Sequence, residues 1–247
     1  MNNVGLMKYE IKRIVGSKKY LYVLLLIAAT TYDSLTRLVI NGYLGTAPFS
    51  QWTYAFFISM ISPVLMASMI FIVSDIFNEK EIRVRSIIYS SPISQIQYYM
   101  LKSSSVFVIF ILTSLVPIFM SFIYYKAIFG YSEFGSFIKF IIVFLLPTFI
   151  FLLGLSMILG KINGKLIYVL IPITFLMGML NFDNIIPIWA DIFGNNFLST
   201  YSYMMLLGRK TEAVAFKFPS SFIFTRLELI ILGIIFLVYT FIKTEKK

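Results

Sequence analysis

The stretch Asn78–Lys102, NEKEIRVRSIIYSSPISQIQYYMLK, lies between two long apolar runs and interrupts them with charge and a Ser-Pro break. Its first half holds the charged residues Glu79, Lys80, Glu81, Arg83 and Arg85. These residues predict a polar helix that continues the preceding apolar run and ends near Tyr89. Serine favours a helix N-cap and proline suits the first helical position. Ser91 and Pro92 therefore predict a second helix, which begins at Pro92 and enters the next apolar run at Lys102.

The composition around this stretch is that of a chain surrounded by lipid. The 247 residues are 59% hydrophobic and 13% charged, with a mean hydropathy of +0.88. Soluble domains average about 25% charged residues. The absence of Cys and His excludes disulfides, thiol nucleophiles, Cys/His metal sites and histidine bases. We attribute the net charge of +10 to the distribution of loop charges described below and not to nucleic-acid binding.

The apolar runs predict an all-α membrane protein with six spans, because a helix needs about 20 apolar residues to cross a bilayer. The predicted spans are Tyr20–Ile40, Trp52–Phe77, Ser103–Tyr125, Phe137–Leu159, Leu166–Leu180 and Phe222–Ile242. The fifth is short. Pro63, Pro117, Pro147 and Pro172 fall inside spans, where we expect kinks and not helix ends.

The basic residues predict how the chain is oriented. With both ends inside, the inner segments hold fourteen of the 21 Lys and Arg residues. An excess of Lys and Arg marks the cytoplasmic side. We therefore expect a multi-pass protein of the cell membrane with cytoplasmic N- and C-termini. The first apolar run is too long for a cleaved signal peptide, so we expect it to be retained.

The first 19 residues predict a separate basic helix. Val4, Met7, Ile11 and Ile14 recur at helical spacing on one face, with the charged residues largely off it. Such a helix favours the membrane interface; the alternative is a disordered basic leader. The chain then forms one transmembrane domain over 1–247, with an elbow helix at 1–19, a core at 20–242 and a tail at 243–247.

The stretch EKEIRVRSIIYSSPIS, Glu79 to Ser94, resembles the first cytoplasmic loop of ABC-2 type permeases, the membrane subunits of type V ATP-binding-cassette exporters. The family's pattern is filled here by Glu79, Lys80, Glu81, Ser91, Pro92, Ile93, Ser94 and Lys102. The family often has Gly-Thr where this chain has Arg83 and Val84. By composition alone, the same stretch also fits an ordinary solvated loop.

The resemblance implies an exporter in which this loop forms a coupling helix on a separate ATPase subunit, with two permease chains and two ATPase chains. ATP and magnesium would be bound by the ATPase, and this chain would carry no cofactor. The resemblance and the apolar spans imply an amphipathic substrate, such as an antimicrobial peptide, a lantibiotic, a phenol-soluble modulin or a drug. The alternatives are a scaffold or sensor bound to an ATPase, and a passive channel.

The sequence lacks the motif for binding ATP itself. A P-loop reads G-x-x-x-x-G-K-[ST], and the nearest match, GKINGKL from Gly160, has its glycines too close and ends in Leu166. We therefore expect no enzymatic activity in this chain.

Four charged residues within the predicted spans are costly in lipid and are candidates for a functional cluster. Asp33 and Arg37 lie four residues apart in the first span, and Arg226 and Glu228 lie in the sixth. The family places these two spans close together, which makes a cross-pair an expectation; snorkelling is the alternative for the arginines.

The outer segment from Asn181 to Ser221 predicts two short re-entrant helices, or an interfacial aromatic belt. The candidate helices are Ile185–Phe193 and the run STYSYMMLLGRK, for which Gly208 would be the C-cap.

Overall fold

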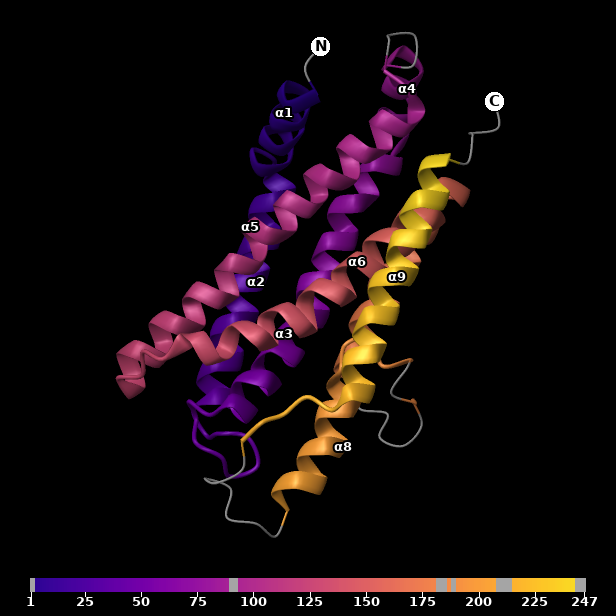
Figure 1. The fold of residues 1–247 in the computed structure, drawn as a ribbon. Helices are drawn as coiled ribbons and strands as arrows, with labels where there is room; N and C mark the ends of the chain where they lie inside the picture. Colours follow the sequence, from indigo (N-terminus) through magenta and orange to yellow (C-terminus); the bar gives the residue numbers. More distant parts are fainter. Residues whose placement is uncertain (1–2, 89–92, 181–185, 188–189, 208–214, 243–247) are drawn as a thin grey trace.

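The computed structural model describes the fold of residues 3–88, 93–180, 186–187, 190–207 and 215–242 (Figure 1). In this part of the chain all regular structure is helical. The α-helices are α1 (Asn3–Val15), α2 (Lys18–Ser34), α3 (Gln51–Val73), α4 (Glu79–Ile88), α5 (Gln95–Phe129), α6 (Ile138–Ile162), α7 (Gly164–Met179), α8 (Asn195–Leu206) and α9 (Ser220–Ile242). A π-helical turn, Leu35–Val39, prolongs α2, and 3-10 turns follow α3 and precede α6.

Five helical segments are long and apolar enough to cross a membrane. They are Lys18–Val39, Gln51–Phe77, Gln95–Phe129, Phe134–Ile162 and Ser220–Ile242. These correspond to five of the six predicted spans. The predicted span Leu166–Leu180 is the shorter helix α7, whose 16 residues extend about 24 Å against a hydrocarbon core of about 30 Å.

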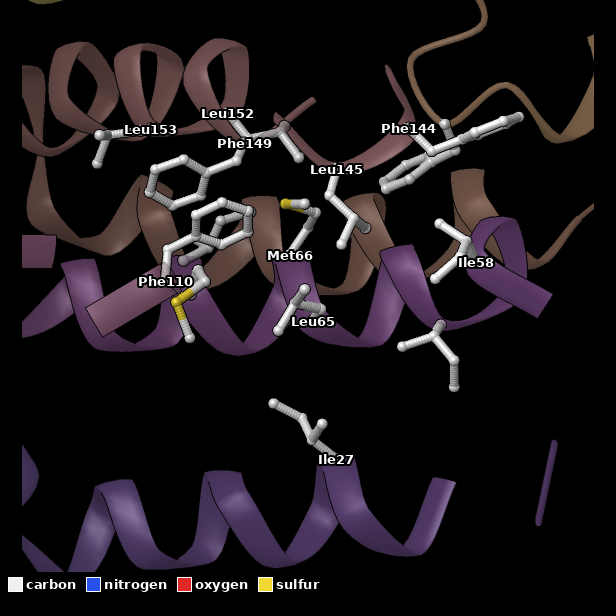
Figure 2. Packing of buried hydrophobic residues seen from close by; sticks show 14 of the residues in the cluster. Ile27, Ile58, Leu65, Met66, Phe110, Phe144, Leu145, Phe149, Leu152 and Leu153 are labelled. Atoms are coloured by element: carbon white, nitrogen blue, oxygen red, sulfur yellow. The ribbon is translucent and has the colours of Figure 1, made fainter. Parts of the chain in front are cut away.

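Helix α3 is the centre of the bundle, and nearly all of its residues are buried. It packs against α2, α5, α6 and α7. Figure 2 shows Leu65 and Met66 of α3 among Phe110 of α5, Phe149 of α6 and Ile27 of α2. The rings of Phe110 and Phe149 stack with centroids 3.9 Å apart. The central position of α3 follows from these contacts with four neighbouring helices, since the outer helices are also apolar on the side that faces lipid.

Two glycines let α6 and α9 pack in close contact. A Cβ atom added to Gly154 would lie 2.4 Å from the carbonyl oxygen of Gly233, and one added to Gly233 would lie 2.5 Å from that of Ile150. Small residues at such crossings allow two membrane helices to approach through their backbones. Helix α9 is fixed to the bundle mainly through this contact with α6.

The outer helices turn apolar side chains away from the protein. Leu21 and Leu25 on α2, Phe119 on α5, and Phe224 and Ile231 on α9 are all exposed. Exposed apolar surface of this extent is unfavourable in water and suits lipid. With the five long apolar helices, it indicates a protein embedded in a membrane.

The polar elements gather at one end of the bundle. Figure 1 shows α1, α4 and the end of α9 at the same end, with α8 at the opposite end. Helix α5 has 35 residues and extends about 52 Å, which exceeds the thickness of the hydrocarbon core. We place its first turns beside α1, outside the hydrocarbon. This region of α1, α4 and the start of α5 is called the polar end below.

The segment between α7 and α9 differs from its prediction. The described residues show one helix there, α8, which begins at Asn195 and not at Ser199. Gly194 precedes it in the left-handed conformation, with φ of 77°. Within the other predicted helix, Ile185–Phe193, residues 190–193 are not α-helical, and part of this range lies outside the described residues, as does Gly208.

Candidate functional site

Helix α4 begins and ends with residues that stabilise it locally. The Asn78 side chain accepts a hydrogen bond of 2.7 Å from the backbone N–H of Glu81, which caps the first turn. The carboxylates of Glu79 and Glu81 lie in the first turn and Arg85 in the last. Negative charge at the N-terminus of a helix and positive charge at its C-terminus both interact favourably with the helix dipole. The predicted polar helix is therefore present up to Ile88, and its expected end at Tyr89 lies outside the described residues.

Helix α5 begins three residues later than the Ser-Pro pair predicts. Ser94 is its N-cap and forms a capping box with Gln97, in which each side chain accepts a hydrogen bond from the other residue's backbone N–H. The reason is that the S-x-x-Q spacing satisfies two N–H groups at once, which a lone serine before proline does not. Ile93 is not helical, and Ser91 and Pro92 lie outside the described residues.

Helix α4 has two faces of different character. Glu81 and Arg85 are buried, each with 6% of its surface exposed. Ile82 and Val84 are about half exposed. The side chains of Glu79 and Arg83 are almost fully exposed and form an ion pair of 3.9 Å. Glu79, Lys80, Ile82, Arg83 and Val84 form what we call the outward face of α4.

The buried face of α4 belongs to an ion network that joins three helices. The Lys102 ammonium lies 2.9 Å from a Glu10 carboxylate oxygen and 2.5 Å from one of Glu81. The Arg13 guanidinium lies 2.6 Å from Glu10 and 3.1 Å from Glu81. The Tyr98 hydroxyl donates to Glu81 at 2.8 Å. Two carboxylates thus face two cations, which compensates the cost of burying each charge.

Arg85 connects the network to the end of α3. One guanidinium nitrogen donates to the carbonyl oxygen of Ile76 at 2.8 Å, and another to the Tyr99 hydroxyl at 3.0 Å. The rings of Phe77, Tyr98 and Tyr99 surround the guanidinium group. Arg85 is therefore a structural anchor that fixes α4 to the bundle.

The surroundings of Glu81 and Arg13 favour their charged forms. Burial by itself raises the pKa of Glu81, but the hydrogen bond and charge of Lys102, with Tyr98 and Arg13, lower it below the ordinary value. Burial opposes the charge on Arg13, yet Glu10 and Glu81 raise its pKa. The ion pairs of these two residues connect α1, α4 and α5.

A second connection lies beside the network. The Lys19 ammonium, at the start of α2, lies 2.8 Å from the Asp75 carboxylate and 3.8 Å from the centroid of the Phe71 ring. Asp75 follows α3 in its 3-10 turn. The start of the first span is thereby joined to the end of the second that lies at the polar end.

The four charged residues predicted within the spans do not form one cluster. Asp33 and Arg37 pair with each other at 2.7 Å on an exposed surface. Glu228 is exposed, whereas Arg226 is buried. The expected cross-pair is wrong because α2 packs on α3 and α5, while α9 packs mainly on α6. Among the described residues, no ion pair joins Asp33 or Arg37 of the first span to Arg226 or Glu228 of α9.

Arg226 instead fixes the segment before α8. Its guanidinium donates to the carbonyl oxygen of Ile192 at 2.7 Å and to that of Asp191. The two oxygens of the Asp191 carboxylate accept from the backbone N–H groups of Gly194 and Phe197, both at 2.8 Å. This arrangement caps α8 and anchors it to α9, and we assign it a structural role.

Sequence reasoning missed Glu10, Arg13 and Tyr98 as members of the site. Glu10 was expected off the apolar face of its helix, but it lies buried against Lys102. The available signal was spacing, since Glu10 is three residues from Met7 and four from Ile14. Tyr98 carried no signal distinguishable from the other aromatic residues of α5.

Among the residues that the structure describes, no group of three or more acidic side chains could hold a metal ion. The polar end therefore combines charge-paired contacts between helices with an exposed outward face on α4. Comparisons with protein-family models, with curated proteins and with solved structures give no significant match for this chain.

Proposed function

We propose that this chain is the permease subunit of an ATP-driven exporter, and that the outward face of α4 is the docking site for a separate ATPase chain. One observation carries the proposal. Helix α4 holds its inner face to α1 and α5 through buried ion pairs, and presents its outer face, with both charge signs and two apolar side chains, to solvent.

This arrangement suits the transmission of force. A displacement of α4 is transmitted to α1 through the ion pair of Glu81 with Arg13, and to α5 through the ion pair of Glu81 with Lys102. Separating Glu81 from Lys102 leaves a buried charge uncompensated, which costs about 3–5 kcal/mol, whereas the Arg13 side chain is 40% exposed and its pair contributes less. The three helices therefore move together. A solvated loop without these ion pairs would not transmit the displacement to the other two helices.

The rest of the proposal follows from this coupling. ATP and magnesium bind to the ATPase chain, and a second permease chain completes the pathway. With six crossings, α7 belongs to the fifth, and α1 and the end of α9 face the cytoplasm. The spans are rich in apolar and aromatic residues, which favours an amphipathic peptide or drug as the exported substrate.

Co-purification tests the docking site. The tagged chain is purified in detergent from membranes of its native host, and the accompanying proteins are identified by mass spectrometry. We expect the wild-type chain to retain an ATPase and the variant Ile82→Glu/Arg83→Glu to lose it, since both side chains are exposed and the fold stays intact.

Lys126→Glu is the matched control, because Lys126 is an exposed residue at the other end of α5. This variant should retain the ATPase. An ATPase that stays bound to the double variant, or its absence from the wild-type sample, would overturn the proposed docking site.

Reconstitution separates an exporter from a scaffold or sensor. With the purified complex in vesicles, we expect an amphipathic helical peptide to stimulate ATP hydrolysis and to accumulate on the side opposite the ATPase. Stimulation without accumulation would identify a sensor. The absence of both stimulation and accumulation across a panel of such peptides would contradict peptide export.

A further inference from the structure

The half of α2 farther from the polar end carries charge on an exposed face. Lys18–Val39 and Ser220–Ile242 bury the same small share of their residues, yet Lys18–Val39 is the least apolar of the five long spans. Tyr32, Asp33 and Arg37 are all exposed there. This part of α2 therefore differs from the apolar faces of the outer helices, which suit lipid.

Asp33 lies well inside the span. The span ends at Val39, six residues later, which corresponds to about 9 Å along a helix. An aspartate side chain is too short to reach the interface from this depth, unlike the longer side chain of Arg37. Charged side chains within a span face other protein or water and seldom lipid. We therefore expect this face of α2 to be covered in the membrane.

The pair of Asp33 with Arg37 leaves bonding capacity unused. The Nε atom of Arg37 lies 2.7 Å from the Oδ1 atom of Asp33, and the two side chains are 77% and 58% exposed. Neither side chain has another partner among the residues that the structure describes. A guanidinium group has more N–H donors than one such contact uses, and a carboxylate accepts several hydrogen bonds. Both groups can therefore bind a second pair of opposite charges.

The arrangement of these charges fits a second copy of the same chain. Two copies related by a two-fold axis along the membrane normal place equal residues at equal depth and present the same surface to each other. Arg37 lies one helical turn from Asp33, and its long side chain can reach across to the partner copy's Asp33. Ala29, one turn before Asp33, is exposed and small, which allows the two helices to approach.

Helix α9, the other sparsely buried span, lacks such a match. Its exposed charged residue is Glu228, whereas Arg226 is buried and donates to the carbonyl oxygens of Ile192 and Asp191. Two copies that met at α9 would bring like charges together, which is unfavourable. Charge complementarity therefore favours α2 as the contact between copies.

We propose that two copies of this chain associate through the face of α2 formed by Ala29, Tyr32, Asp33 and Arg37, with Arg37 of each copy paired to Asp33 of the other. The inference deepens the proposed function and rests on it in one respect: the second permease chain of the exporter becomes another copy of this chain. Self-association itself needs no ATPase, so it can be measured separately.

Disulfide cross-linking in membranes tests the contact. The chain contains no cysteine, so Ala29→Cys introduces a single thiol. The full chain is expressed in a heterologous host, its membranes are oxidised, and the products are separated without reductant. We expect most of the Ala29→Cys chain to form a disulfide-linked dimer.

Ile231→Cys is the matched control, because Ile231 is 58% exposed at the centre of α9. This variant should remain largely monomeric under the same oxidation. No dimer from Ala29→Cys, or as much dimer from Ile231→Cys, would overturn the proposed contact.

Two charge variants test the pairing across copies. Asp33→Arg leaves two bases on the face, and Arg37→Asp leaves two acids. Each variant should therefore lose the co-purification of two differently tagged copies that the wild-type chain shows. Co-expression of Asp33→Arg under one tag with Arg37→Asp under the other should restore it, because opposite charges then meet only between copies.

The melting temperature of each charge variant establishes that it is folded. Should one fail to fold, the cysteine variants decide alone. Folded charge variants that are not restored by co-expression, or no self-association of the wild-type chain, would overturn the inference. An ATPase retained by a chain that does not self-associate would contradict this inference alone, whereas self-association without a retained ATPase would contradict the proposed docking site alone.

Discussion

The ammonium group of Lys102 lies between two buried carboxylates, those of Glu10 and Glu81, which come from α1 and α4. The attraction between these groups offsets the cost of removing them from water only while all of them are present. Without Lys102, the Arg13 guanidinium alone would face both carboxylates. The contact of α5 with the other two helices therefore depends on this side chain.

We predict that Lys102→Ala destabilises the protein by about 3–5 kcal/mol, the usual cost of breaking a buried pair from one side. The measurement is thermal unfolding in detergent, with Lys126→Ala as the control at an exposed position of α5. The double variant Lys102→Met/Glu81→Gln should recover part of the loss. Equal melting temperatures for Lys102→Ala and the control would contradict the buried network.

Glu81 makes the stability of the polar end depend on pH. Its pKa is lowered in the folded chain, so the unfolded chain binds a proton more readily. The stabilisation is complete above the ordinary glutamate pKa of about 4.3 and is lost as the pH falls through the lower folded value. We predict that Glu81→Gln reduces the loss of melting temperature between pH 6 and pH 3. The exposed control Glu79→Gln should lose as much melting temperature between pH 6 and pH 3 as the wild-type chain. An equal loss for both variants would contradict the assignment of the pH dependence to Glu81.

At the scale of the helices, the contact of α6 with α9 rests on glycine. A Cβ atom on Gly233 would lie 2.5 Å from the carbonyl oxygen of Ile150 and 2.7 Å from the backbone nitrogen of Phe151. Backbone atoms cannot move aside as a side chain does. We predict that Gly233→Ala costs about 1–3 kcal/mol, the usual range for overpacking.

The comparison for Gly233→Ala is Gly135→Ala, since a Cβ atom at Gly135 meets nothing within 4 Å. Both variants add one methyl group. Because alanine favours the interior of α9 over glycine by about 1 kcal/mol, a loss of stability at Gly233 relative to Gly135 is a lower bound on the cost of the contact. The measurement is the melting temperature in detergent, supported by the yield of folded protein. A Gly233→Ala variant as stable as Gly135→Ala would show that α9 packs on α6 in a different way.

The long helices could be predicted from the sequence because lipid-facing and core-facing positions are both apolar, so that run length alone reveals them. Their ends were less predictable. Helix α5 begins at Gln95, two turns before the predicted apolar span at Ser103, because Ser94 and Gln97 cap a polar extension. The S-x-x-Q spacing was visible in the sequence and favoured this start.

The candidate site was predictable in its location and not in its contacts. The charged stretch after α3 indicated the polar end, and α4 is present there. Which of its charges point inward depends on α1, which is distant in the sequence, so Glu81 and Arg85 were grouped with the exposed Glu79 and Arg83. The anchor formed by Arg226 and Asp191 likewise joins segments whose proximity no local pattern indicates.

At the scale of the whole molecule, polar connections at one end are combined with lipid-facing helices along the sides. The network of α1, α4 and α5, the pair of Lys19 with Asp75, and the outward face of α4 all lie at the end that holds the start of the chain and the end of α9 (Figure 1). The outward face of α4 is exposed at this end, where a soluble partner can reach it. We propose that this partner is an ATPase bound at α4.

Site-specific cross-linking tests that claim most directly, because the chain contains no cysteine and a single one can be introduced cleanly. Arg83→Cys on the outward face of α4 and Glu133→Cys at the other end of the bundle are treated with a short thiol–amine cross-linker in native-host membranes. The account predicts a product containing a P-loop ATPase for Arg83→Cys and none for Glu133→Cys. No ATPase product from Arg83→Cys, or the same product from both positions, would contradict it.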